Sequence, residues 1–156
     1  MKFLTGLPAI GFIVLVFIFG CQGEEACLSN QNAVQAGLYS AWSDEDKDST
    51  LQNVSLVGIN RIDSIYRDQS LSEFFMPLDF ESDTSTFVVG VSATMKDTLS
   101  IVYRKELDFI SRDCGYIFTF DIDTILYSNA FIDSVAIAYP IVKYGESAEN
   151  IKLFIY

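Results

Sequence analysis

The sequence predicts an all-β fold, a single sandwich of about seven to nine strands. Apolar and polar side chains alternate with a period of two in many short segments of residues 33–156, which is the pattern of half-buried strands. These segments follow one another at spacings of roughly ten to fifteen residues. No convincing segment has the 3.6-residue period of an amphipathic helix. Two packed sheets are therefore expected, with a small closed barrel as the alternative.

The first part of this region contains four expected strands. The first strand stops at the charged residues 44–49, which are interpreted as a solvated hairpin loop. The fourth contains Pro77, which cannot donate a hydrogen bond to a ladder, so this segment is expected to be an edge strand or a strand entry. The four strands are expected at 34–42, 54–59, 63–66 and 74–80.

The second part contains the clearest strand pattern, in residues 86–95. Lys96 and Asp97 are predicted to form a tight turn, after which alternation resumes and completes a hairpin. Residues 131–142 are apolar on both faces, as a central strand would be, although Pro140 shifts its end toward an edge. The strands are expected at 86–95, 99–104, 116–120, 131–142 and 151–156. Together they predict a single immunoglobulin-like β-sandwich.

The first twenty residues are interpreted as a secretory signal peptide. Residues 7–19 form an apolar stretch of about 13 residues, whereas roughly 20 are needed to span a bilayer. Gly20 directly precedes Cys21, and this arrangement resembles the bacterial lipobox, in which the cysteine is acylated and the peptide is cut before it. An ordinary signal peptide or an anchor helix with a coincidental cysteine is the alternative. The expected organisation is a cleaved signal peptide (1–20), a lipidated tether (21–32) and a sandwich domain (33–156).

The net charge and the lack of histidine argue against several classes of function. The chain has 10 basic and 21 acidic residues, a formal net charge of −11, and Lys2 is the single charge of the first twenty residues. Such acidity argues against nucleic acid as a partner, because its phosphates would be repelled. The chain has no histidine, the commonest general base and a frequent metal ligand. We expect neither an enzyme nor a bound cofactor or metal.

Three cysteines are an awkward number for an exported protein. If Cys21 carries lipid, Cys27 and Cys114 remain, and we expect them to form a disulfide. That bond would close a loop of about 87 residues and stabilise the fold by about 4 kcal/mol. A metal ligand or a catalytic thiol is the competing interpretation, but either would need further cysteine or histidine partners.

Several stretches resemble a known family. Cys21 is followed by an acidic pair and a second cysteine, and residues 76–79 and 83–87 read Met-Pro-Leu-Asp and Asp-Thr-Ser-Thr-Phe. The most specific stretch is Ser-Arg-Asp-Cys-Gly-Tyr at residues 111–116. Over most of residues 21–156 the chain resembles a family of small Bacteroidetes lipoproteins of unknown function. The resemblance implies an envelope lipoprotein and adds no activity.

Glu24 and Glu25 follow the expected lipidation site. In Bacteroidetes such acidic residues look like the signal that sends a lipoprotein to the outer face of the outer membrane. The resemblance therefore implies a surface-exposed lipoprotein, and a soluble tether on a periplasm-facing protein is the alternative.

Three groups of carboxylates could carry chemistry. Asp121 and Asp123 lie on one side of a strand pattern, as a general acid/base pair would, or they flank a turn. Residues 44–48 imitate the start of a calcium loop, but Ser49 and Ser55 stand where Gly and Glu are needed. The third group could hold a cation or form a solvated loop; it comprises Asp79, Glu81 and Asp83.

Trp42 and Tyr39 are the candidate binding residues. Aromatic rings on a sheet surface can anchor a protein partner or stack on sugar rings. Two functions follow: a non-enzymatic accessory subunit of an outer-membrane protein assembly, or a glycan-binding surface lipoprotein in nutrient capture. Exposure of Trp42 and Tyr39 to solvent is the observation expected to separate them. In both cases the membrane is a partner through the lipid.

Overall fold

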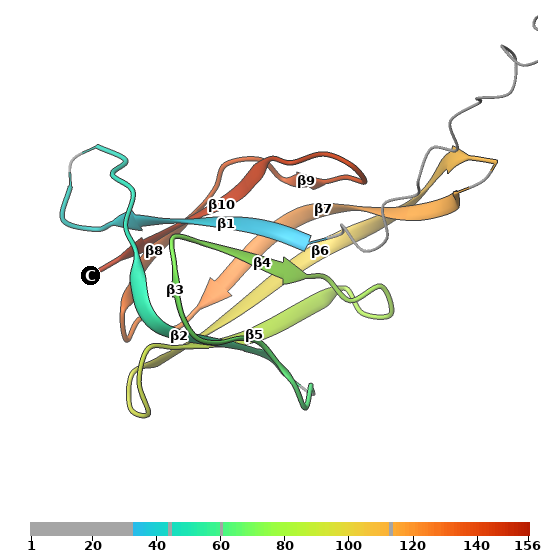
Figure 1. Ribbon diagram of the computed structural model, residues 1–156. Helices are drawn as coiled ribbons and strands as arrows, with labels where there is room; N and C mark the ends of the chain where they lie inside the picture. Colours follow the sequence, from blue (N-terminus) through green and yellow to red (C-terminus); the bar gives the residue numbers. More distant parts are fainter. Residues whose placement is uncertain (1–32, 44, 60, 113) are drawn as a thin grey trace, which may run out of the picture.

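The computed structural model describes residues 33–43, 45–59, 61–112 and 114–156, which form two packed β-sheets (Figure 1). This confirms the predicted all-β sandwich. The part of the chain that the structure describes contains no helix long and apolar enough to cross a membrane. In chain order the strands are β1 (Ala33–Ser40), β2 (Leu51–Gly58), β3 (Ser64–Leu71), β4 (Glu73–Pro77), β5 (Thr84–Gly90), β6 (Lys96–Ser111), β7 (Gly115–Tyr127), β8 (Ile132–Ile137), β9 (Ile141–Val142) and β10 (Glu149–Ile155).

One sheet has four strands in the order β4-β1-β10-β8. Its two central strands, β1 and β10, are paired in parallel although most of the chain lies between them. β4 is at an edge of this sheet, and Pro77 ends it, as the missing backbone donor of proline predicts.

The other sheet has six strands in the order β3-β2-β5-β6-β7-β9. Its longest members are β6, with 16 residues, and β7, with 13 residues, and they form one continuous hairpin. The far end of this hairpin projects beyond the sandwich (Figure 1).

The core lies between the sheets and is built by the alternation that the sequence shows. Val34, Ala36 and Leu38 point inward from β1, and their neighbours Gln35 and Tyr39 are only partly buried. The largest fully buried side chains are Tyr103, Phe74, Phe120, Leu38, Leu56, Met76, Leu99, Ile101, Ile132, Ile151, Leu153 and Val34.

The predicted turn at Lys96 and Asp97 is wrong. β5 ends at Gly90, the connection occupies residues 91–95, and both predicted turn residues belong to β6. The Asp97 carboxylate is buried and accepts hydrogen bonds from Ser128 Oγ (2.6 Å) and from the backbone nitrogens of residues 130–132. Burial alone would raise the pKa of Asp97, but these hydrogen bonds lower it. The carboxylate fixes the connection from β7 to β8.

The predicted central strand at 131–142 is also wrong. This segment contains two short strands in different sheets, β8 and β9, and each lies at a sheet edge. Pro140 lies between them, and its carbonyl accepts a hydrogen bond from the Ile122 nitrogen (2.8 Å). The segment is not buried on both faces: Ile132 and Val142 are buried, whereas Ile137 and Tyr139 are exposed.

The predicted signal peptide and tether, residues 1–32, lie outside the described residues, and so do the lipidation site Cys21, the acidic pair Glu24 and Glu25, and Cys27. The predicted disulfide therefore stays a prediction. Its other half, Cys114, is partly buried at the hairpin turn, where its backbone nitrogen donates to Ser111 Oγ (3.0 Å).

Candidate functional site

Four aromatic side chains gather at one end of the four-stranded sheet. Tyr39 of β1 and Phe154 of β10 are opposite each other in the parallel register, with ring centroids 5.8 Å apart. Trp42 and Tyr156 follow the ends of the same two strands, with centroids 5.7 Å apart. We call these four residues the aromatic surface. The parallel pairing of two strands distant in sequence creates it.

Trp42 is the most accessible member of this group. The expected first strand extended to Trp42, but β1 ends at Ser40, and the indole is 79% exposed. Tyr156 is also exposed, whereas Tyr39 and Phe154 are partly buried. Trp42 therefore faces solvent, and Tyr39 does so in part.

The polar atoms around these rings have partners inside the protein. The Tyr39 hydroxyl donates to both carboxylate oxygens of Glu149, at 2.9 and 3.1 Å, and the Tyr156 hydroxyl donates to Asp133. The Glu149 hydrogen bond, assisted by burial, raises the pKa of Tyr39 to about 12. Tyr39 is therefore a neutral donor at physiological pH, and the exposed rings of Trp42 and Tyr156 are the recognition elements that remain.

A positive charge lies over one of the rings. The Lys152 Nζ is 5.1 Å from the centroid of Tyr39, within cation–π range, and it pairs with Asp46 of the β1–β2 loop. The Asp46 hydrogen bond raises the pKa of Lys152. These contacts hold the β1–β2 loop beside Tyr39, and its residues 45–48 are exposed to solvent as expected. The loop is not a hairpin, because β1 and β2 lie in different sheets.

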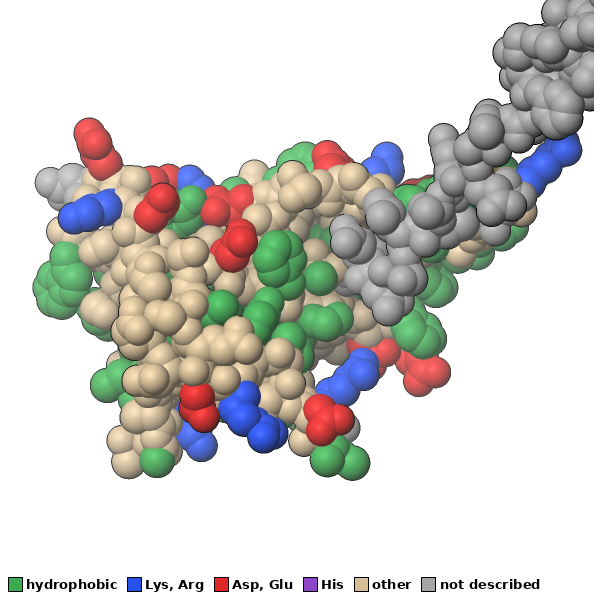
Figure 2. Space-filling model, viewed as in Figure 1, with side chains coloured by type: hydrophobic (Ala, Val, Ile, Leu, Met, Phe, Trp, Pro, Cys, Tyr) green, Lys and Arg blue, Asp and Glu red, His purple; other side chains and the backbone are tan. Residues whose placement is uncertain are grey.

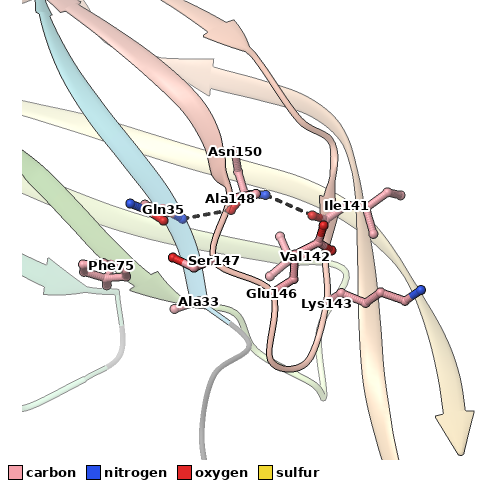
Figure 3. Close-up of a pocket in the computed structure, with 10 residues that line it drawn as sticks. All are labelled: Ala33, Gln35, Phe75, Ile141, Val142, Lys143, Glu146, Ser147, Ala148 and Asn150. Carbon is pink, nitrogen blue, oxygen red and sulfur yellow. Dashed lines mark hydrogen bonds between the residues drawn. The ribbon is translucent and has the colours of Figure 1, made fainter. Parts of the chain in front are cut away.

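A pocket of about 230 Å³ lies at the opposite end of β1, between its first residues and the β9–β10 loop (Figure 3). Apolar side chains such as Phe75 and Val142 line it together with the polar groups of Lys143 and Glu146. Local sequence patterns do not predict this pocket, because its walls come from strands that are distant in the chain.

Asn150 explains why the pocket has its shape. Its buried side chain accepts a hydrogen bond from the Gln35 nitrogen (3.0 Å) and donates to the carbonyl of Ile141 (3.0 Å) (Figure 3). It also donates to the carbonyl of Tyr139 (3.1 Å). Ile141 belongs to the six-stranded sheet, so this one amide joins the two sheets at the pocket wall. This link between the sheets explains why the polar side chain of Asn150 is buried.

The predicted acid/base candidates lie together but are ion-paired. Asp121 and Asp123 are in the middle of β7, so the alternative that they flank a turn is wrong. Arg104 binds both, with nitrogen–oxygen distances of 2.7 and 3.1 Å. This pairing gives the two carboxylates a structural role between β6 and β7.

The expected cation loop is also engaged in local contacts. Asp79 Oδ1 accepts from the Glu81 nitrogen (2.9 Å), and Asp83 pairs with Lys105 (2.9 Å). Among the described residues, no group of three His, Cys, Asp or Glu side chains is arranged to hold a metal ion. Of the calcium-like residues, Asp44 lies outside the described part, and Asp46 contacts Lys152.

A family model for a family of unknown function (DUF6452) matches residues 53–155, more than half of the 156-residue chain. The chain belongs to this family. Comparison with curated proteins and with solved structures gives no match. Within the DUF6452 match lie the β6–β7 hairpin and Phe154, whereas Tyr39, Trp42 and Tyr156 lie outside it.

Sequence reasoning found two of the four aromatic surface residues in this DUF6452 protein. It missed Phe154 and Tyr156, although both are in the alternating terminal segment, because only the parallel register of β1 and β10 brings them to Tyr39 and Trp42. It also missed Asp97, since a Lys-Asp pair after a clear strand is typical of a turn.

Proposed function

We propose that this protein is a lipid-anchored lipoprotein of the outer membrane that acts without catalysis, as an accessory subunit of an outer-membrane protein assembly. The aromatic surface carries this proposal, because Trp42 presents a large, exposed ring beside Tyr156. Exposed Trp and Tyr residues dominate the binding energy of many protein interfaces. The neighbouring hydroxyls already donate to Glu149 and Asp133, so apolar contact is the main interaction that remains.

Membrane attachment rests on the sequence. Acyl chains on Cys21 would hold the domain, and Glu24 and Glu25 favour the cell-surface side over the periplasmic side. Protease treatment of intact cells tests the side: digestion before the outer membrane is broken supports surface exposure.

The proposed Cys27–Cys114 disulfide is tested by titrating thiols in the unfolded, unreduced mature protein, where two free thiols would contradict it.

The subunit role is tested by mild detergent extraction followed by affinity purification. We expect an integral barrel protein to copurify with the full lipidated chain, and Trp42→Ala to reduce its recovery at least tenfold. Phe80→Ala is the matched control, because Phe80 is also an exposed aromatic residue but lies in the β4–β5 connection. A clean monomer from the unmodified protein would count against the proposal.

Glycan binding is the second candidate. The exposure of Trp42 does not separate the two functions, because an exposed indole suits a sugar platform as well as a protein interface. A flat indole can stack on a sugar ring, and Glu149 has further lone pairs for sugar hydroxyls. Affinity electrophoresis in gels that contain a polysaccharide would show retardation abolished by Trp42→Ala. Normal retardation of that variant would exclude the aromatic surface as a sugar platform.

A further inference from the structure

The free end of the β6–β7 hairpin is an arm that the rest of the sandwich does not cover. The antiparallel ladder continues to the pairs Phe109–Tyr116 and Ser111–Gly115, so the strands stay paired to the turn. Gly115 has a φ of 69°, which glycine adopts without strain at this turn. We call residues 107–112 and 114–118 the hairpin arm; it extends past the four-stranded sheet (Figure 1).

One face of the arm continues the face that forms the core. Phe120 is buried in the sandwich, and the same alternation places Phe118 and Tyr116 on that face farther along β7. Leu107 and Phe109 of β6 are their direct partners in the register. Leu107 and Phe109 are each 57% exposed and Tyr116 is 66% exposed, because no strand of the other sheet reaches them.

The opposite face of the arm is mixed, because Asp108 lies directly opposite Ile117 in the ladder and accepts a hydrogen bond from Thr119. Ile110 is exposed there, and Ile117 is only partly buried. Hydrophobic side chains are visible along this part of the molecule in Figure 2. The contiguous apolar groups are therefore those of the first face, and contiguous exposed apolar groups mark interaction sites or membrane contacts.

The position of the arm indicates which surface covers it. β1 begins at the end of the sandwich from which the arm projects (Figure 1). Ala33 is twelve positions after the proposed anchor Cys21, so a lipid there would lie within about 40 Å of the start of β1. Cys114, in the arm, is the proposed partner of Cys27, which is six residues from Cys21. The start of β1 and the hairpin arm are therefore on the same side of the domain.

We propose that the hairpin arm docks on the bilayer that holds the acyl chains, with Leu107, Phe109 and Tyr116 in the headgroup interface. This inference rests on the proposed lipid anchor. Aromatic rings with a polar edge are enriched at the membrane–water interface. Contact at two points, the lipid and the arm, would hold the domain in one orientation, and Trp42, at the other end of β1, would face away from the membrane.

Quenching by brominated lipids tests the docking. Trp42 is the sole tryptophan of the chain, so Trp42→Phe combined with Tyr116→Trp moves the fluorophore to the arm. Each full lipidated protein is reconstituted in phosphatidylcholine–phosphatidylethanolamine vesicles whose acyl chains are partly brominated. We expect the fluorescence of Trp at position 116 to fall at least twofold, and that of Trp42 in the unmodified protein to stay unchanged.

Two readouts separate this inference from the function on which it rests. Flotation of the protein with the vesicles reports the anchor, and its absence would overturn both proposals. Flotation without quenching at position 116 would overturn the docking alone. Protection of that residue from acrylamide without quenching would also overturn it, because protein would then cover the arm. Trp42→Phe with Phe109→Trp repeats the test if the first variant does not fold.

Discussion

We call the part of the β6–β7 hairpin inside the sandwich, residues 96–106 and 119–127, the root. The root and the hairpin arm have the same alternation of side chains, but they differ in whether the other sheet covers them. At the root, Tyr103 packs edge-on against Phe120 with ring centroids 5.1 Å apart, and both are almost fully buried. In the arm, Phe109 packs against Tyr116 at 5.3 Å, and both are mostly exposed. Both pairs lie on the same face of one ladder: Phe109 and Tyr116 are direct partners, whereas Tyr103 is diagonal to Phe120.

The difference shows that strand alternation determines which side chains share a face and leaves open what covers that face. The root is covered by the four-stranded sheet, so its apolar side chains stabilise the fold. The arm lacks that cover, and its apolar side chains are available for binding. The effect of a substitution should therefore change along the hairpin while the residue types stay similar.

The largest effect is expected for Phe120→Ala at the root. Removing a buried aromatic side chain costs about 3–5 kcal/mol of unfolding free energy. The matched change Phe109→Ala in the arm should cost less than about 1 kcal/mol, since the ring is already in solvent. Urea unfolding followed by circular dichroism measures both. Equal losses would show that the arm is part of the core.

Asp97→Asn should cost about 2–3 kcal/mol, because hydrogen bonds to a buried charged group are lost or weakened. The folded pKa of Asp97 is lowered, so its contribution is full above the unfolded value of about 3.9 and is lost as pH falls through the folded pKa. Stability measured from pH 7 to pH 2 should therefore fall less in the variant than in the unmodified protein. Parallel curves would contradict this role.

Tyr103→Phe removes one hydroxyl from the root. That hydroxyl bonds to Ser85 Oγ (2.8 Å) and donates to the Asp79 carbonyl (2.6 Å), which ties β6 to the β4–β5 connection. Loss of this buried network should cost about 1–2 kcal/mol. The comparable change in the arm, Tyr116→Phe, is the control and should leave the denaturation midpoint unchanged.

Leu107→Ser is expected to have the smallest effect on stability, within about 0.5 kcal/mol, because surface substitutions rarely exceed that. Its consequence should instead be seen in solubility and membrane contact. A thermal melt without lipid checks the first expectation. A large drop in melting temperature would mean that an undescribed part of the chain covers the arm.

The sequence predicts correctly those strands that have one face buried in the core and the other face less buried. Phe87 and Val89 predicted a strand correctly because Thr86 and Val88 are less buried, although the strand ends at Gly90 and not at Met95. Residues 131–142 have the apolar run of a central strand, but they form two edge strands, and Ile137 is exposed. A continuous apolar run cannot distinguish these two cases.

The candidate site was predictable only in part. Trp42 and Tyr39 are close in sequence, so their shared position could be inferred. Phe154 and Tyr156 join them through the register of β1 and β10, a contact between residues more than one hundred positions apart. Local patterns carry no information about such pairing, because parallel partners need a long crossover connection.

The parallel pairing of β1 and β10 also constrains the order of assembly. The four-stranded sheet cannot close until residues 149–155 have been synthesised and have reached β1. Contacts between such distant segments form slowly, because the loop must close before they contribute energy. An exported precursor with this topology would stay unfolded while it is threaded through a secretion channel and would complete its core on the far side.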